Sequence, residues 1–182
     1  MSTIDFQGPG YTATARALHW LTAVLVITMI VVGLVMANMT SGPTQNLLFN
    51  LHRSTGVVLI PIILYRLLYR IMHPPPPLPD DIPDIQKLAA EGLHWTLYAL
   101  LVAQPIIGWI ATSAYRAPIV VFGLFELPPI AEENRAFSEQ AFTVHRAIGI
   151  LLAILIIGHV GAALFHHFVR KDHVLLRMVR GG

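Results

Sequence analysis

Four long apolar segments, separated by polar or proline-rich stretches, are the feature that most constrains the fold of this chain. A helix needs about 20 mostly apolar residues to cross the hydrocarbon core of a membrane. We predict such helices over about residues 16–38, 49–72, 88–114 and 139–169. Only 12% of the 182 residues are charged, against roughly a quarter in an ordinary soluble domain. The sequence therefore predicts an all-α integral membrane protein, a single four-helix bundle over residues 1–182 that is surrounded by membrane lipid.

Lysine and arginine collect on the side of the bundle that carries both chain ends. That side has Arg16, Arg66, Arg70, Lys87, Arg170, Lys171, Arg177 and Arg180, and the other side has Arg53, Arg116, Arg135 and Arg146. Because cytoplasmic loops carry the excess of these residues, we predict that both termini lie in the cytoplasm. The first apolar segment lacks a strongly basic start and is longer than a typical signal core, so we interpret it as a retained helix.

The composition excludes several classes of cofactor. The chain has no cysteine, which excludes disulfides, iron–sulfur clusters and covalent attachment of haem. The net charge of +2 gives no reason to expect nucleic acid. Nine histidines are the unusual number in so apolar a chain. Ionisable residues at membrane depth are costly and usually functional, so the histidines are the candidate site.

Two histidines of the fourth segment have an informative spacing. His145 and His159 are fourteen residues apart, which is within about 40° of four full helical turns and roughly 21 Å along the axis. One helix face therefore presents a ligand at each of two depths. His19 is expected at the depth of His159, and His52 at the depth of His145. This pattern predicts two bis-histidine haems, one near each membrane face. Spacing also permits a rival pairing of His19 with His94.

Short motifs around these histidines suggest how a haem could fit. His52 and His145 both begin the pattern H-R-x-x-G. The arginines of the motif, Arg53 and Arg146, are candidates for pairing with haem propionates, because a guanidinium matches the geometry of a carboxylate. The glycines, Gly56 and Gly149, lie one turn after each ligand and could let a flat macrocycle approach the backbone.

Other readings of the histidines remain open at this point. Imidazole also binds zinc and copper, but the ligands separate into two distant layers. A haem-free transporter or scaffold could use histidine for proton relay, although the predicted spans lack Asp and Glu at depth. The tryptophans after His19 and His94 are typical of interface anchors.

The sequence resembles the bacterial cytochrome b561 family over nearly its whole length. The resemblance rests on R-x-L-H-W at Arg16–Trp20, H-R-x-x-G at His52, P-x-x-G at Pro105–Gly108, the pair of His145 and His159, and the tail from His166 to Met178. It implies a di-haem protein of the bacterial inner membrane. It also implies two noncovalent haems b, ligated by His19 with His159 on the cytoplasmic side and by His52 with His145 on the periplasmic side.

The resemblance also implies an activity, namely electron transfer from superoxide at the periplasmic face to ubiquinone. His94 is then free for another role, and we take His94 with Trp95 or Trp20 as candidates for the quinone site. The four arginines of the outer side could steer superoxide, but four glutamates share that side. An alternative function is a quinone-linked cytochrome b subunit of a larger dehydrogenase or hydrogenase, with the 115–138 loop as the docking surface for a partner redox subunit.

Overall fold

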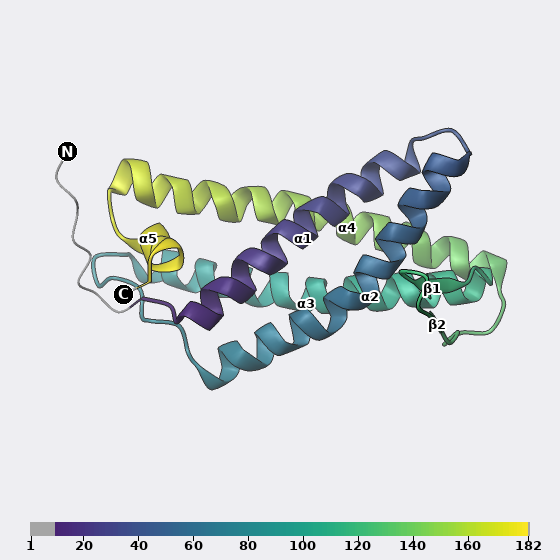
Figure 1. Ribbon diagram of the computed structural model, residues 1–182. Coiled ribbons are helices and arrows are strands. Elements are labelled where there is room, and N and C mark those ends of the chain that lie inside the picture. The colour runs from purple at the N-terminus through teal and green to yellow at the C-terminus, as the bar shows by residue number, and fades with distance from the viewer. Residues whose placement is uncertain (1–9, 182) are drawn as a thin grey trace.

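The computed structural model describes residues 10–181 (Figure 1). Within this range it contains the long helices α1 (Ala13–Ala37), α2 (Pro43–Met72), α3 (Asp84–Tyr115) and α4 (Arg135–Phe165). The last of these continues into a π-helical turn, η1 (His166–Arg170), and the short helix α5 (Val174–Val179) follows. All four long helices have the length and apolarity needed to cross a membrane. The prediction of an all-α, four-helix membrane bundle is confirmed.

Each long helix begins a few residues earlier than the sequence predicts. The side chains of Thr12 and Asn134 cap α1 and α4 by accepting a hydrogen bond from the backbone N–H of the third helical residue. Such caps satisfy backbone donors that have no partner inside the helix, so the helices extend past the apolar segments on which the prediction was based. Pro61 and Pro105 lie within continuous helices, as expected.

The two ends of the bundle have different structures (Figure 1). One end, here called the terminal end, contains Tyr11, the proline run 74–77 and α5. The opposite end, the hairpin end, contains the turn 38–42 and two antiparallel strands, β1 (Ile119–Val121) and β2 (Phe125–Leu127). The sequence predicts only a loop here. Gly123 adopts a φ of +77° between the strands, a conformation that glycine allows without strain and that a tight hairpin turn requires.

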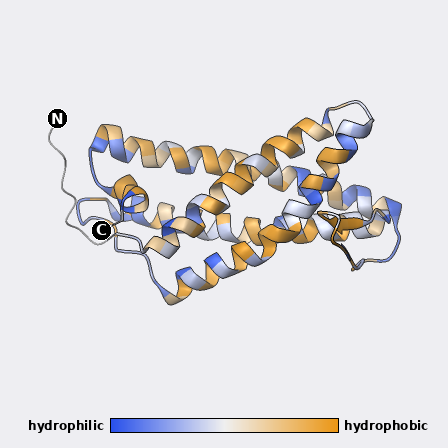
Figure 2. Ribbon diagram, in the orientation of Figure 1, coloured by the Kyte–Doolittle hydropathy of each residue, from blue (hydrophilic) through white to orange (hydrophobic). Residues whose placement is uncertain are grey.

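The helices pack as two hairpins, α1 against α2 and α3 against α4, which are joined mainly where α2 meets α3. In the described part of the chain α1 touches α4 only slightly, and α2 and α4 make still fewer contacts. Figure 2 shows apolar residues along the helices and hydrophilic residues gathered at both ends. Many large apolar side chains are exposed on the helix surfaces, and only 6–33% of the apolar window of each long helix is buried. This distribution fits a bundle whose outer surface faces lipid.

Candidate cofactor site

The four long helices each carry two site positions that are fourteen residues apart on one face. These pairs are His19 and Gly33 in α1, His52 and Arg66 in α2, His94 and Gly108 in α3, and His145 and His159 in α4. The spacing corresponds to nearly four turns, or roughly 21 Å. The bundle therefore has two layers of site residues. The terminal layer consists of His19, Arg66, His94 and His159, and the hairpin layer consists of Gly33, His52, Gly108 and His145.

The hairpin layer brings together two imidazole rings from α2 and α4, helices that make few contacts with each other. The ring centres of His52 and His145 are 6.2 Å apart, and the ring planes are inclined at 74°. A Cβ atom at Gly33 would lie 3.3 Å from Cε1 of His52, and one at Gly108 would lie 3.0 Å from Cε1 of His145. Both glycines are therefore needed for the close approach of the helix backbone to an imidazole ring. The sequence analysis did not single out Gly33, although its fourteen-residue spacing from His19 could have revealed it.

The backbone of α3 fixes the orientation of the His145 ring. Nδ1 of His145 donates to the carbonyl oxygen of Gln104 at 3.1 Å, and Nε2 of Gln104 donates to the carbonyl oxygen of His145 at 2.8 Å. Because a carbonyl only accepts, Nδ1 carries the proton and Nε2 keeps a free lone pair, which is the tautomer that binds a metal. On the opposite ring, Nδ1 of His52 is buried without a hydrogen-bond partner in the described structure. Gln104 was missed in the sequence analysis.

The terminal layer gathers three imidazole rings and one guanidinium group. The ring centres of His19 and His159 are 6.2 Å apart, the same separation as in the hairpin layer. His94 is nearer to His159, at 5.4 Å. Nη2 of Arg66 lies 2.9 Å from Nδ1 of His19. The structure thus places His94 in the same layer as the two ligand candidates, as its position in the sequence suggested.

A layer of aliphatic side chains separates the two site layers. Each helix contributes one residue halfway between its two site positions, and these are Val26, Leu59, Leu101 and Leu152. Val26, Leu59 and Leu152 are buried, and Leu101 packs against the cluster that contains the first two. The interior between the layers is therefore apolar at these positions.

The two arginines of the H-R-x-x-G motif have different surroundings. The Arg53 guanidinium donates to the carbonyl oxygen of Pro118 at 3.0 Å and to Oδ1 of Asn50 at 2.8 Å. It therefore ties the connection before β1 to α2. Arg146 is exposed on α4. The pairing of either arginine with a propionate stays a prediction.

The glycines of the same motif do not face the paired imidazole rings. A Cβ atom at Gly56 would meet only the methyl group of Met29, at 3.7 Å, whereas one at Gly149 would lie 3.3 Å from Nε2 of Gln104. Contact of Gly56 or Gly149 with a macrocycle likewise stays a prediction.

The tryptophans proposed for a quinone site have different neighbours at the terminal end. The indole N–H of Trp20 donates to the carbonyl oxygen of Met178 in α5, at 3.1 Å. The half-exposed ring of Trp95 lies beneath Arg70, whose Cζ is 5.6 Å from the ring centre. Trp20 thus contacts the C-terminal segment and Trp95 contacts Arg70, and both residues are about half exposed.

The start of η1 carries a contact that the sequence analysis did not anticipate. Nδ1 of His166 and a carboxylate oxygen of Asp172 form a short hydrogen bond at the terminal end. The other Asp172 oxygen accepts from the backbone N–H of Val174, at the first turn of α5. Asp172 therefore links the end of α4 to the start of α5.

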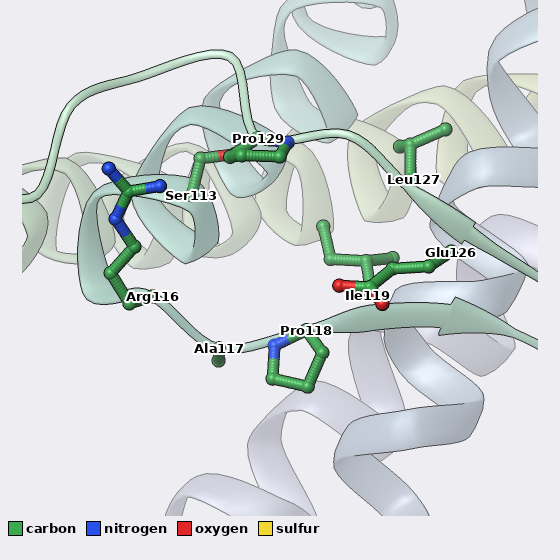
Figure 3. A pocket seen from close by; sticks show the side chains of 8 residues that line it. All are labelled: Ser113, Arg116, Ala117, Pro118, Ile119, Glu126, Leu127 and Pro129. Carbon is green, nitrogen blue, oxygen red and sulfur yellow. The ribbon is translucent and has the colours of Figure 1, made fainter.

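A small pocket lies at the hairpin end between the end of α3 and the two strands (Figure 3). Its volume is about 160 Å³, below the range of roughly 300–1,000 Å³ that is typical of cofactor sites. Figure 3 shows Arg116 on one side of the pocket and Glu126 on the other. Arg116 also lies 3.8 Å from a carboxylate oxygen of Glu133. Glu133 thus offsets the charge of Arg116, whereas Arg135 and Arg146 are exposed and form no ion pair among the described residues.

Four apolar helices that bring histidines together in pairs at two depths define a helical membrane protein built to bind a metal-centred cofactor inside the bilayer. Among the described residues no group of three or more His, Cys, Asp or Glu could hold a metal ion. Haem is consistent with this arrangement, because its iron takes only two ligands from the protein. The paired rings and the free lone pair on Nε2 of His145 fit such a group.

The chain belongs to the prokaryotic cytochrome b561 family, whose profile matches residues 10–181. It is 35% identical to cytochrome b561 homolog 2 of Escherichia coli, over 93% of this chain and 90% of the relative. It is 30% identical to the "Probable superoxide oxidase CybB" of Yersinia pestis, over 93% of this chain and 95% of the relative. The resemblance noted from the motifs is confirmed, and membership implies a membrane cytochrome with haem b as its cofactor.

Proposed function

We propose that this protein transfers electrons across a bacterial inner membrane through two haems b. His52 and His145 ligate one haem, and His19 and His159 ligate the other. The observation that carries the proposal is the equal 6.2 Å separation of the two ring pairs, one in each layer. An imidazole nitrogen binds a metal at about 2.0 Å and lies roughly 1.1 Å from the ring centre, so two rings on opposite sides of one metal have centres about 6.3 Å apart. The 5.4 Å between His94 and His159 is too short for this arrangement.

A haem that histidines ligate on both faces would supply one-electron transfer and would have no open coordination position. The protein residues hold the two sites apart and make the middle of the space between them apolar. Val26, Leu59 and Leu152 fill the space that separates the layers. Gln104 holds the His145 ring in the tautomer that leaves Nε2 available.

Superoxide is the proposed electron donor at the hairpin end, and ubiquinone is the proposed acceptor at the terminal end. Two superoxide anions yield two electrons and two molecules of oxygen, and ubiquinone takes up two electrons and two protons to form ubiquinol. The relative named as a probable superoxide oxidase supports this assignment. His94 is the proposed quinone contact, together with Trp95 or Trp20. The excess of lysine and arginine at the terminal end supports its placement in the cytoplasm.

An absorbance spectrum of the detergent-purified protein, with haem counted per chain, tests the ligand assignment. We expect two low-spin haems in the wild type and one fewer in each of His19→Ala, His52→Ala, His145→Ala and His159→Ala. His94→Ala should retain both haems. A colourless, folded wild-type protein would instead support the transporter or scaffold hypothesis, and loss of haem from His94→Ala would support the rival pairing.

One observation favours the second candidate function, a quinone-linked subunit of a larger dehydrogenase or hydrogenase. The hairpin tip from Phe122 to Phe125 is apolar and exposed, and the Leu124 side chain is 81% exposed. Such a tip could contact a partner redox subunit. Direct reduction of the protein by superoxide, when it is purified alone, separates the two functions. A protein that superoxide does not reduce, but that copurifies with a redox partner, would favour the second.

A further inference from the structure

Three arginines gather around two tyrosines at the terminal end. Arg66 and Arg70 of α2 lie over the ring of Tyr98, with Cζ atoms 5.2 and 5.7 Å from its centre. Arg177 of α5 is only 8% exposed. The carbonyl oxygen of Arg177 accepts a hydrogen bond from the backbone N–H of Tyr11 at 3.3 Å. Burial raises the pKa of the Tyr11 phenol, and Arg66, Arg70 and Arg177 oppose that rise. We call Arg66, Arg70 and Arg177 the arginine cluster.

The arginine cluster has no carboxylate partner in residues 10–181. The lysine and arginine ion pairs of this range involve Lys87, Arg116 and Arg170. Nη1 of Arg177 donates to the carbonyl oxygen of Pro77 at 2.6 Å, whereas its Nε is buried without a hydrogen-bond partner. Removing a cation from water costs several kcal/mol unless an anion or equivalent hydrogen bonds compensate. The cluster therefore has the properties of an anion-binding site.

Helix α5 is held against the part of α1 that contains His19. Three successive carbonyl oxygens of the C-terminal segment accept hydrogen bonds from this region. The carbonyl oxygen of Arg177 accepts from the backbone N–H of Tyr11. The carbonyl oxygen of Met178 accepts from the indole N–H of Trp20, and the carbonyl oxygen of Val179 accepts from Nη1 of Arg16. Carbonyl groups at the end of a helix have no partner within the helix, so these contacts stabilise both segments. They also fix Arg177 close to the terminal layer.

The contact between Arg66 and His19 cannot persist if Nε2 of His19 binds a metal. In the structure the guanidinium donates to Nδ1 of His19, so Nδ1 is unprotonated and Nε2 carries the proton. An imidazole that binds a metal through Nε2 has its proton on Nδ1, and a guanidinium cannot accept it. Arg66 then needs another anionic or neutral acceptor, and a carboxylate is its best geometric match.

We propose that the arginine cluster binds the propionate carboxylates of the haem ligated by His19 and His159, and that α5 closes this site. The inference rests on the proposed function. Propionates are anions, and the terminal end is the nearer exit from the apolar interior for a group in the terminal layer. A lipid phosphate offers similar anionic oxygens, so the test must separate the two sources.

The first experiment compares the full-length variants Arg177→Gln, Arg177→Lys and Arg180→Gln. Arg180 is exposed in the turn after α5 and serves as the matched control. Arg177→Gln should lower the midpoint potential of one haem only, because a cation stabilises the more negative reduced state, and should speed the loss of that haem. Arg177→Lys should have a midpoint potential and a rate of haem loss between those of Arg177→Gln and the wild type. If Arg177→Gln behaves as Arg180→Gln does, while the wild type holds two haems, the inference is wrong and the proposed function stands. A wild type with fewer than two haems would contradict the proposed function itself.

The second experiment identifies the anion. Apo-protein in lipid-free detergent is titrated with iron protoporphyrin IX and with its dimethyl ester, which lacks both carboxylates. The wild type should bind the free acid about ten to a hundred times more tightly, as expected for hydrogen bonds to charged groups, and Arg177→Gln should reduce this ratio. If Arg177→Gln had the same affinity ratio as the wild type, the inference would be overturned in favour of a lipid phosphate. Asp5 lies outside the described residues. If an Asp5→Asn variant lowered the affinity ratio as Arg177→Gln does, the inference would be overturned in favour of an internal carboxylate.

Discussion

Gly108 of α3 lies so close to His145 of α4 that a Cβ atom at this glycine would be 3.0 Å from Cε1 of the imidazole ring. The two residues are far apart in the chain and meet only because α3 packs along α4. The glycine is part of the hairpin layer, and its lack of a side chain sets the position of the ring.

Gly108→Ala should therefore displace the His145 ring. A methyl group at 3.0 Å forces the ring or the helix to move, which typically costs about 1–3 kcal/mol in a packed interior. We expect a lower thermal midpoint and loss or altered absorbance of one haem, measured by differential scanning fluorimetry and reduced-minus-oxidised spectra. Gly33→Ala, with a contact of 3.3 Å to His52, should have a smaller effect.

Gly158→Ala is the matched control for these two variants. It changes a helical glycine beside His159, and a Cβ atom there would meet nothing within 4 Å among the described residues. This variant should keep both haems with unchanged spectra. If it lost haem as readily as Gly108→Ala does, the packing of Gly108 against His145 would not be the cause.

Ser54→Ala should loosen the β-hairpin from α2. The Ser54 side chain is 2% exposed, and its hydroxyl group donates to the carbonyl oxygen of Val120 and accepts from the backbone N–H of Phe122. Loss of these bonds should cost about 1–3 kcal/mol and speed amide hydrogen exchange in residues 119–127. Thr96→Ala removes a hydroxyl group that, within residues 10–181, bonds only to a carbonyl of its own helix, and it should leave hairpin exchange unchanged.

Arg146→Glu should slow the reaction with superoxide, if the proposed function holds. Arg146 is an exposed cation of the hairpin end, and reversal of its charge should reduce the rate by about twofold to tenfold at low salt. Stopped-flow measurements over a range of ionic strength should also show a weaker salt dependence than in the wild type.

Arg146→Lys keeps the charge and should behave as the wild type does. Arg53 is the poorer choice for this test, because its guanidinium also holds the connection before β1. Equal rates and equal salt dependence for Arg146→Glu and the wild type would rule out steering by this residue.

Tyr11 should make the protein sensitive to alkaline pH. Burial raises the pKa of the Tyr11 phenol above its ordinary value near 10.0, although Arg70, Arg177 and Arg66 oppose the shift. A raised folded-state pKa means that the stability from neutral Tyr11 is fully present below the unfolded pKa and is lost as the pH rises through the folded value. Tyr11→Phe should move the alkaline unfolding midpoint to higher pH. Tyr65→Phe, a change at an exposed tyrosine, should leave the midpoint where it is in the wild type.

The sequence by itself determined the four membrane helices and the positions of the candidate ligands along them. Apolar segments of sufficient length permit few other structures in a membrane, because every backbone polar group there must be satisfied internally. The spacing of His145 and His159 predicts two depths, since helical periodicity is a local property. The ends of the helices were predicted less well, because caps such as Thr12 lie outside the apolar segments.

Only the tertiary structure decided which residues of different helices meet. Sequence spacing left His19 with either His159 or His94 as a partner. Helix packing places the His159 ring 6.2 Å from that of His19 and 5.4 Å from that of His94. The contacts of Gly108 with His145 and of Gln104 with the same ring likewise depend on how α3 lies against α4. The β-hairpin and the arginine cluster arise in the same way, because their side chains come from segments far apart in the chain. Periodicity within one helix cannot specify its rotation against another, and that rotation is set by the packing of all four helices together.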